Sequence, residues 1–339
     1  MKRMSMKPTI EAKPPDTVCV SGYGASGSSP LVALLRECDG YGYMPVEFRL
    51  IKDPYGILAL ESALVDNWDV LPSDNAIKDF LWIAEQLDRT PSRFSLGGMQ
   101  YGRLLDQQFM QLTREYIQNL VNYEYEGHWF FFNFKTTWPT YMWRKLKKKL
   151  GIGFKPQTMY FSKPSREEFI AATTAYLGAL FDRLRARTGA RTVILNQAVP
   201  VFKPTRALDY LANTRLIIVD RDPRDSYVDM INRKLLIGRD LAQDTDASKF
   251  IMWHRSLHDA AHEFEDSRIL RIRFEDLALQ YEATVKRVLE FLHEDESIHR
   301  HKKQHLDPSA AATKIGLWKE HANQNAIDQI YHDLREYCY

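Results

Sequence analysis

A glycine- and serine-rich turn between a strand and a helix constrains this chain more than any other stretch. Residues 18–22 predict a short buried strand, the turn 22–29 is rich in glycine and serine, and Pro30 opens a predicted helix. Small residues let backbone N–H groups converge on an anion, and the helix adds the positive end of its dipole. The stretch therefore predicts an anion site at the end of a strand.

The spacing of the glycines in this turn is that of a Walker A loop, with one difference. Gly22 and Gly27 stand where such a loop has its two glycines, but Ser28 stands where it has lysine. That lysine is the side chain that reaches the β- and γ-phosphates of a nucleoside triphosphate. The turn thus favours an anion other than ATP.

The composition is typical of a soluble globular enzyme. The 339 residues are 45% hydrophobic and 27% charged, and a net charge of +2 gives no reason to expect a nucleic-acid partner. The three cysteines form no CxxC pair, which fits a reducing compartment. No apolar run approaches the roughly 20 residues of a membrane helix, and residues 1–15 lack the apolar region of a signal peptide. We predict a cytoplasmic protein.

Apolar runs that alternate with helical stretches predict a parallel sheet. Residues 192–195 and 216–219 are short continuous apolar runs, as expected of parallel strands buried on both faces. Ser165 and Glu168 form a capping box that starts a long helix, and Gly189 ends it. The predicted fold class is therefore α/β with a central parallel sheet.

We predict one domain, 1–339, with a flexible segment at 1–15. Residues 56–125 show an amphipathic helical pattern, with breaks at Pro72, Pro91 and Gly97-Gly98, and nothing in that stretch carries an obvious reaction. The region 56–165 is therefore predicted to be a mostly helical insertion that forms a substrate-facing cap.

Charged residues follow the predicted strands near the anion turn. Arg221 and Arg224 come directly after strand 216–219, where they could hold a phosphate or pair with the aspartates around them. A short strand is also predicted around residue 46, with Glu47 and Arg49 on one face or paired with each other. The ends of strands are the usual place for chemistry in open α/β sheets.

An aromatic stretch followed by a basic one lies near the middle of the chain. Residues 129–134 predict an aromatic strand that leads into Lys135, a lysine expected to face a cleft or an anion. Pro139 opens a predicted helix, and the basic run from Arg144 to Lys149 lies in it. That run is either a solvated helix face or a docking patch for an anionic glycan or a lipid surface.

Separated segments together resemble the sulfotransferase family that uses 3′-phosphoadenosine 5′-phosphosulfate (PAPS). Residues 24–29 resemble its 5′-phosphosulfate loop, and residues 219–225, with RDPRD after an apolar strand, resemble its 3′-phosphate segment. Residues 273–277 and 314–319 resemble its C-terminal elements, and the order agrees over most of the chain. The resemblance implies a P-loop NTPase-like, three-layer α/β/α fold. It also implies transfer of a sulfuryl group from PAPS to a hydroxyl or amine, with PAP as product.

The resemblance assigns a set of residues to the donor. Those that would bind PAPS are Gly24, Ala25, Ser26, Gly27, Ser28, Ser29, Arg221, Ser226, Lys314 and Gly316. Two positions depart from the family pattern. Ala25 stands where the family usually has Lys or Arg beside the transferring group. Asp229 stands where the family usually has a serine that binds the 3′-phosphate, so Ser226 would take that role.

Positioning and charge stabilisation do most of the work in sulfuryl transfer. Because the turn is neutral where the family has a cation, another cation is needed. Lys135 is the first candidate, with Arg49 and Lys52 as second choices. Glu47 resembles the glutamate base of the glycan-type members, and His128 is the alternative base.

The acceptor is predicted to be a glycan, because Glu47 and Lys135 resemble that branch of the family. Aromatic side chains such as Trp138 suit stacking on a sugar ring or covering a flat lipid, so a sterol or other lipid alcohol is the alternative. No metal is required, since a sulfuryl group carries less charge than a terminal phosphate. His299 and His301 would be the metal candidates, but neither is on a predicted regular scaffold.

Two other classes of protein remain open. A Mg-dependent NTPase or kinase would use Asp220 as a Walker B aspartate, but the missing lysine at Ser28 and the arginine directly after Asp220 count against it. A nucleotide-binding protein that has lost its activity is the other class, because Ala25 is neutral.

Overall fold

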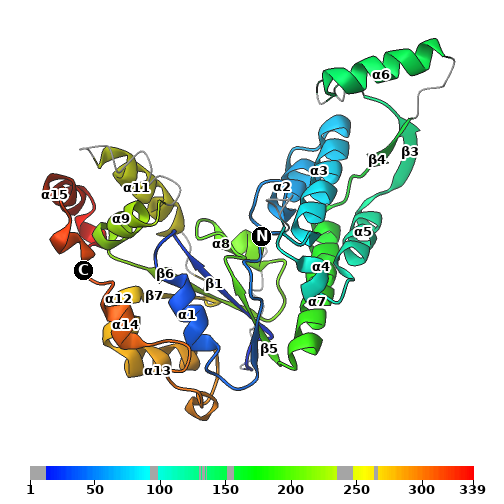
Figure 1. Cartoon of the computed structure of the whole chain (residues 1–339). Coiled ribbons are helices and arrows are strands. Elements are labelled where there is room, and N and C mark those ends of the chain that lie inside the picture. Colours follow the sequence, from blue (N-terminus) through cyan, green and yellow to red (C-terminus); the bar gives the residue numbers. More distant parts are fainter. Residues whose placement is uncertain are drawn as a thin grey trace, which may run out of the picture. The chain divides into compact units, whose positions relative to one another are not determined.

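The chain forms two compact units (Figure 1). Unit 1 is made of Met1–Lys52 and Leu177–Tyr339, and unit 2 is Asp53–Tyr176. The computed structural model describes residues 13–91, 98–129, 131, 134, 136–150, 156–234, 247–262 and 266–339.

A parallel sheet of five strands forms the centre of unit 1, in the order β2-β5-β1-β6-β7. The strands are β1 (Thr17–Gly22), β2 (Tyr41–Tyr43), β5 (Thr192–Asn196), β6 (Thr214–Asp220) and β7 (Ile269–Arg273). Every residue of β1 is buried, which explains the apolar run at residues 18–20. Because β1 and β6 are parallel neighbours, the turns that follow them emerge at the same edge of the sheet.

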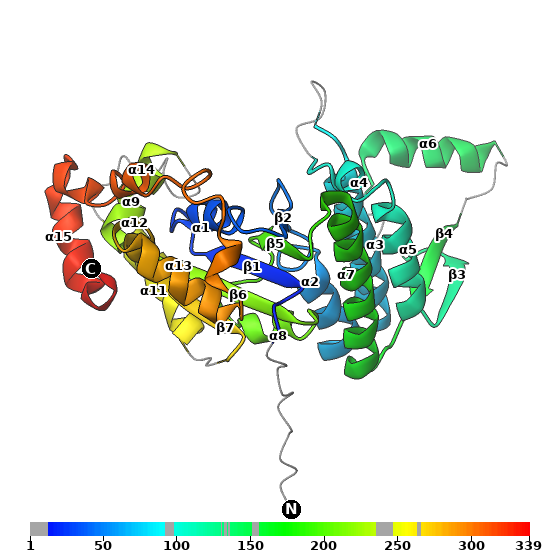
Figure 2. The same cartoon turned by 90° about the horizontal axis from the view of Figure 1, so that it is seen from below.

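Helices of unit 1 bury alternate strand residues. Val20 and Ile217 of the sheet share one apolar cluster with Leu31 of α1 and Val288 of α13. A second cluster joins α9, α11 and α15, which lie together in both views (Figures 1 and 2). The helices of this unit are α1 (Ser28–Leu35), α8 (Pro204–Leu208), α9 (Pro223–Asn232), α11 (Ser248–His262), α12 (Phe274–Leu279), α13 (Tyr281–Phe291), α14 (Pro308–Ala312) and α15 (Gln324–Asp333). Short 3-10 turns are η3 (Glu296–Ile298), η4 (Leu317–Glu320) and η5 (Arg335–Tyr337).

Unit 2 is mostly helical and carries one antiparallel pair of strands, β3 (Tyr123–Gly127) and β4 (Gln157–Phe161). Its helices are α2 (Ile57–Glu61), the π-helical turn η1 (Ser62–Asp66), α3 (Val70–Asp88), α4 (Tyr101–Leu104), α5 (Phe109–Leu120) and α6 (Trp138–Lys149). Helix α7 (Arg166–Thr188) starts in unit 2 and ends in unit 1. In the core, Tyr116 stacks on Tyr176, and its hydroxyl lies 2.8 Å from Thr173 Oγ1.

The predicted fold class is confirmed, and so are the strands at 18–22, 192–195 and 216–219. The capping box is also confirmed, because Ser165 N–H donates to Glu168 Oε2 (2.7 Å) and Glu168 N–H donates to Ser165 Oγ (3.1 Å). Among the described residues, no helix combines the length and the apolarity that crossing a bilayer requires.

Two predicted strands are wrong. The strand around residue 46 ends earlier, at Tyr43, although Phe48 N–H still donates to Asn196 O (2.9 Å). Of the predicted aromatic strand, residues 129, 131 and 134 are described and none of them is in a strand, since β3 ends at Gly127 and Phe134 N–H donates to Phe131 O (3.0 Å). The rest of that prediction lies outside the described residues. In both cases the described bulky residues follow a strand that has already ended.

Two prolines have different roles from those predicted. Pro30 is the third residue of α1 rather than its first, and Pro72 lies in the first turn of α3 instead of breaking a helix. The N–H groups of a first turn have no partner inside the helix, so proline is tolerated there.

Candidate active site

A pocket of about 670 Å³ opens in unit 1 beside the turn that follows β1. Its volume lies in the range of small-molecule sites. Five basic side chains and two carboxylates line it, and this excess of positive charge suits an anion. These charged residues are Glu47, Arg49, Lys52, Arg221, Asp229, Arg233 and Lys314.

The turn after β1 lines the pocket with small residues in left-handed backbone conformations. Gly24, Ala25 and Gly27 have φ angles of 84°, 51° and 97°. A Cβ on Gly27 would lie 2.5 Å from Phe274 Cδ2, so only glycine fits there. Gly27 also precedes α1, whose first turn contains no acid. Small residues beside a helix N-terminus are the arrangement that binds phosphate groups.

Two hydrogen bonds connect Lys52 to this turn. Lys52 Nζ donates to Gln197 Oε1 (2.8 Å), and Gln197 Nε2 donates to Ser28 Oγ (3.2 Å). Gln197 directly follows β5, and its N–H donates to Val20 O (2.7 Å) of β1. A lysine is therefore held beside the turn whose Ala25 is neutral.

Glu47 and Arg49 line the pocket and pair with each other. Arg49 Nη1 lies 2.8 Å from Glu47 Oε2, and both side chains are partly exposed. Phe48, Leu50 and Ile51 are buried, which anchors the segment that carries the pair. Both alternatives expected for Glu47 and Arg49 therefore hold together: they lie in the pocket and they form an ion pair.

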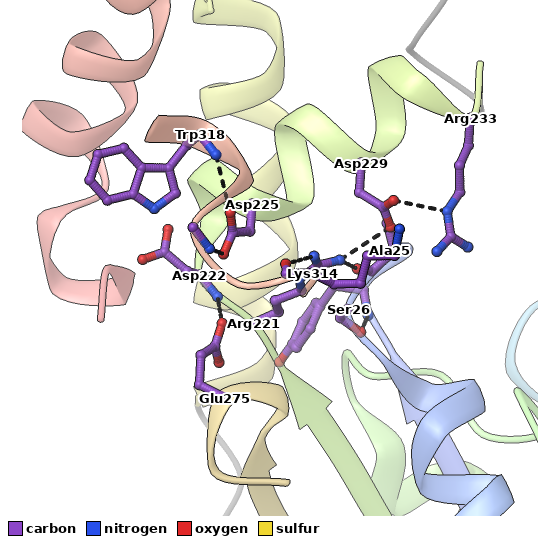
Figure 3. A network of polar contacts seen from close by, with 12 residues as sticks. Ala25, Ser26, Arg221, Asp222, Asp225, Asp229, Arg233, Glu275, Lys314 and Trp318 are labelled. Atoms are coloured by element: carbon purple, nitrogen blue, oxygen red, sulfur yellow. Dashed lines mark hydrogen bonds and ion pairs between the residues drawn. The ribbon is translucent and has the colours of Figure 1, made fainter. Parts of the chain in front are cut away.

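Arg221 is a buried wall of the pocket, with only 3% of its side chain exposed. Its Nη1 donates to Ala25 O (2.7 Å) and to Asp229 Oδ2 (3.1 Å), and its Nη2 donates to Lys314 O (2.6 Å) (Figure 3). Its Nε is buried and has no hydrogen-bond partner among the described residues. Arg221 is thus fixed by three acceptors and keeps one buried donor for a ligand or water.

Asp229 connects two arginines of the pocket. It accepts from Arg221 and, through Oδ1, from Arg233 Nε (2.9 Å), as Figure 3 shows. Its carboxylate is nearly buried, and it stands at the position where the sequence resemblance expects a serine. An anion that binds Arg221 would meet this negative charge.

Arg224 does not line the pocket. Its Nη2 pairs with Asp222 Oδ2 (2.6 Å) and donates to Tyr339 O (3.1 Å), and its guanidinium lies 4.0 Å from the ring centre of Trp318. Asp222 also caps α9 by accepting from Arg224 N–H. The two alternatives for the RDPRD segment therefore apply to different arginines. Arg221 lies at the pocket, and Arg224 belongs to an ion-pair network.

Two residues expected to bind the donor lie outside the lining of this pocket. Gly316 N–H donates to Asp225 Oδ2 (2.8 Å). Burial raises the pKa of Asp225, although hydrogen bonds from Gly316 and Trp318 oppose the rise. Ser226 lines a separate small cavity beside the turn, together with the aromatic ring of Tyr23.

A stack of rings lines the same small cavity. His258 lies between Tyr23 and His254, with ring centroids 3.9 Å apart on both sides, and its Nε2 is 3.6 Å from Asp220 Oδ1. Burial, and secondly the neighbouring His258, lowers the pKa of His254 to about 3. The stack therefore links the turn after β1 to the end of β6 through His258, with an uncharged His254 on the other face of that ring.

The other predicted residues that the structure describes do not line this pocket. Lys135 lies outside the described residues. His128 and Trp138 belong to unit 2, where Trp138 is 73% exposed at the start of α6. His299 is buried and pairs with Glu37 (2.8 Å), and the described residues contain no cluster suited to a metal.

A glycine-rich turn between β1 and α1, on a parallel sheet and beside a basic pocket, defines a P-loop-like α/β protein. The family model described as "Sulfotransferase family" matches residues 103–297, more than half of the chain. The chain therefore belongs to the sulfotransferase family and is a sulfotransferase, as the sequence resemblance predicted.

Solved structures of sulfotransferases and a related enzyme are similar to this chain. The sulfotransferase domain from the Synechococcus PCC 7002 olefin synthase is 15% identical, with a TM-score of 0.44 and 98% of each chain covered. Sulfotransferase STF9 from Mycobacterium avium is 13% identical (TM-score 0.41; 96% of this chain and 76% of that chain). Retinol dehydratase, in complex with androsterone and the inactive cofactor PAP, is 13% identical (TM-score 0.33; 95% and 80%). No curated protein matches the sequence.

Among the polar residues that line the pocket, Gln197 and Arg233 were not predicted from the sequence. Gln197 directly follows an apolar strand, so its place at a strand end was the available signal. Arg233 lies four residues after Asp229 on α9, the spacing at which helical ion pairs form. That spacing was visible in the sequence.

Proposed function

We propose that this sulfotransferase moves the sulfuryl group of PAPS to a hydroxyl group of its acceptor and releases PAP. The observation that carries the proposal is the pocket of unit 1, where the glycine-rich turn, the start of α1 and five basic side chains meet. PAPS is anionic at both ends, and a positively charged pocket of this size suits it.

The residues of the pocket fit both ends of this donor. At one end, Gly24–Ser29 would hold the 5′-phosphosulfate, in a space that a Cβ on Gly27 would close by pushing into Phe274. At the other end, Arg221 has a buried Nε without a partner among the described residues, and Lys314 lines the pocket beside it. We assign these two residues, with Ser226 close by, to the 3′-phosphate.

Bound PAPS would supply an activated sulfuryl group, whose bond to the 5′-phosphate oxygen breaks as the acceptor oxygen bonds to sulfur. Glu47 takes the proton of the acceptor hydroxyl, and Arg49 orients its carboxylate from 2.8 Å away. Lys52, held through Gln197 beside Ser28, stabilises the charge that develops on the leaving oxygen. Lys52 thereby takes the role that the neutral Ala25 cannot fill.

We assign binding of the acceptor to unit 2, which contains the predicted cap at 56–165. A glycan is the first candidate, because Glu47 resembles the base of the glycan-type members and Trp138 is an exposed ring. A lipid alcohol is the second candidate. It is favoured by the exposed apolar side chains of α6, which include Trp143 and Leu146.

Transfer of labelled sulfate from PAPS to glycan and lipid-alcohol acceptors tests the proposal. We expect transfer to at least one of them, and we expect PAP to raise the melting temperature while ATP with Mg²⁺ does not, because a bound ligand stabilises the fold by mass action. Stabilisation by ATP with Mg²⁺ alone would indicate a kinase or NTPase. Binding of PAP without transfer to any acceptor would indicate an inactive nucleotide-binding protein.

The residue-level test is Glu47→Gln, which keeps the shape of the side chain and removes the base. We expect kcat to fall by roughly 10²–10⁴-fold with PAP affinity unchanged, since a positioned base contributes about that much. The matched control is Glu290→Gln, an exposed glutamate on α13 outside the pocket lining. Undiminished kcat in Glu47→Gln would remove Glu47 as the base and leave His128 as the candidate.

A further inference from the structure

Helix α6 exposes a large amount of apolar surface. The exposed fraction is 73% for Trp138, 58% for Trp143 and 65% for Leu150, which directly follows the helix. Every side chain that the structure describes in α6 is exposed. Leaving large apolar side chains in water is unfavourable, so a cluster of them marks a surface that binds something apolar.

The large apolar residues of α6 gather on one side of the helix. At 100° per residue, positions 138, 142, 146 and 150 form one row, occupied by Trp, Met, Leu and Leu, with Trp143 beside it. Basic positions 144 and 148 lie on the opposite side, basic positions 145 and 147 lie at the two edges of the row, and Lys149 falls within it. No acidic residue occurs from 138 to 150.

The combination of an apolar row with basic residues in α6 favours one kind of partner. An anionic glycan would neutralise the lysines but leave two tryptophans, a methionine and two leucines in water. An apolar protein groove would cover the apolar row but not the basic side. Anionic bilayers offer acyl chains and negatively charged headgroups within a few ångströms of each other, which matches both sides of α6.

We propose that α6 is an interfacial helix that binds the enzyme to the surface of an anionic phospholipid bilayer. Its 12 residues span about 18 Å, short of the roughly 30 Å of a hydrocarbon core. The helix therefore lies in the plane of the surface, with its apolar row among the acyl chains and its lysines at the headgroups. This inference does not depend on the identity of the donor or the acceptor.

Co-sedimentation of the full chain with vesicles tests the inference. We expect binding to an equimolar mixture of phosphatidylcholine and phosphatidylserine, weaker binding to phosphatidylcholine alone, and loss of binding as salt rises. The triple variant Lys145→Gln, Lys147→Gln, Lys149→Gln should bind the anionic vesicles roughly 100-fold more weakly, because each lysine near the surface contributes a fivefold factor or so. The double variant Trp143→Ser, Leu146→Ser should lose at least about tenfold.

A matched control separates the effect of this surface on vesicle binding from the effect of net charge. Lys286→Gln, Lys302→Gln, Lys303→Gln removes three exposed lysines of unit 1 and should leave vesicle binding unchanged. All of the substituted side chains are exposed, so melting temperatures should stay close to that of the wild type.

Three outcomes would overturn the inference. One is equal binding of the wild type and both α6 variants to anionic vesicles. Another is binding to heparin with no binding to vesicles, which would assign the helix to an anionic polymer. The third is a dimer that the Trp143→Ser, Leu146→Ser variant dissociates while vesicles bind neither form, which would assign the apolar row to a second copy of the chain.

Discussion

The turn after β1 and the segment after β6 line the same pocket, but they would hold an anion in different ways. The turn contributes small, neutral residues, and its shape depends on left-handed backbone at Gly24, Ala25 and Gly27. The segment contributes Arg221, whose guanidinium already donates to two carbonyls and to Asp229. One anion site would be made by the backbone and the other by charge.

The difference affects the free energy of anion binding at each site. The site at the turn needs no ion pair to break, so an anion that fits its shape meets no competitor. At the segment, Asp229 is a carboxylate inside the site that competes with any ligand for Arg221 and Arg233. A buried pair of this kind stabilises the fold only if both partners stay satisfied.

Among the tests of this comparison, the largest effect is expected where the turn lacks a cation. Lys52→Ala should lower kcat by about 10²–10³-fold, the usual loss when one group that stabilises developing charge is removed. Adding Ala25→Lys to this variant should recover part of the rate, because Ala25 already holds a Cβ at a φ of 51°. The measurement is kcat for sulfate transfer, with Lys286→Ala as the control on an exposed site.

An unchanged rate in Lys52→Ala would show that the cation comes from elsewhere. Lys135, which lies outside the described residues, would then return as the first candidate.

A comparison of two arginines tests the charged site next. Arg221→Ala should weaken PAP binding by roughly 100-fold, as expected for loss of charge-assisted hydrogen bonds to a phosphate. Arg224→Ala removes an equal charge from the ion-pair network with Asp222 and should leave PAP affinity nearly unchanged while lowering stability. Calorimetric titration with PAP measures both. Equal losses in the two variants would mean that net charge, not the position of Arg221, controls binding.

A pair of glycines tests the backbone site. Gly27→Ala should lower the free energy of unfolding by about 2 kcal/mol through overpacking and backbone strain, because its Cβ would lie 2.5 Å from Phe274 Cδ2 at a φ of 97°. Gly178→Ala, in α7 with nothing within 4 Å of its Cβ, should be neutral or slightly stabilising. Urea unfolding measures both. If Gly27→Ala unfolds no more easily than Gly178→Ala, steric control of the turn is wrong.

The smallest effect concerns the carboxylate in the charged site. Asp229→Asn keeps the shape of the side chain and removes the negative charge, so PAP should bind about tenfold more tightly. Asp225→Asn is the matched control, because Asp225 accepts from Gly316 and Trp318 backbone N–H groups and does not line the pocket. Weaker PAP binding in Asp229→Asn would mean that the carboxylate positions Arg221 rather than competing with the ligand.

The backbone site was predictable from sequence, and the charged site only in part. The order of small residues from Gly22 to Gly27 predicts a turn, because glycine tolerates the positive φ angles of tight turns and an apolar strand comes directly before it. Arg221 and Arg224 look equivalent in the sequence. Their different surroundings depend on Ala25, Lys314 and Tyr339, which are far away along the chain.

Contacts with residues far away along the chain also limit what the sequence predicts of the elements near the pocket. The segment with Glu47 was predicted as a strand from its apolar alternation, but the ladder stops at Tyr43 and only single hydrogen bonds such as Phe48 N–H to Asn196 O continue it. Gln197 had no sequence motif, since its function depends on lying between Lys52 and Ser28. Local pattern predicts elements, whereas partners from distant strands decide which side chains meet.

The division of the chain at Lys52 has a consequence for how such an enzyme changes over evolutionary time. All described residues that line the pocket come before Asp53 or after Tyr176. Substitutions inside unit 2 therefore replace none of the described residues that line the pocket. With acceptor binding in unit 2, as proposed, a change of acceptor would need substitutions only in a single contiguous stretch of the gene.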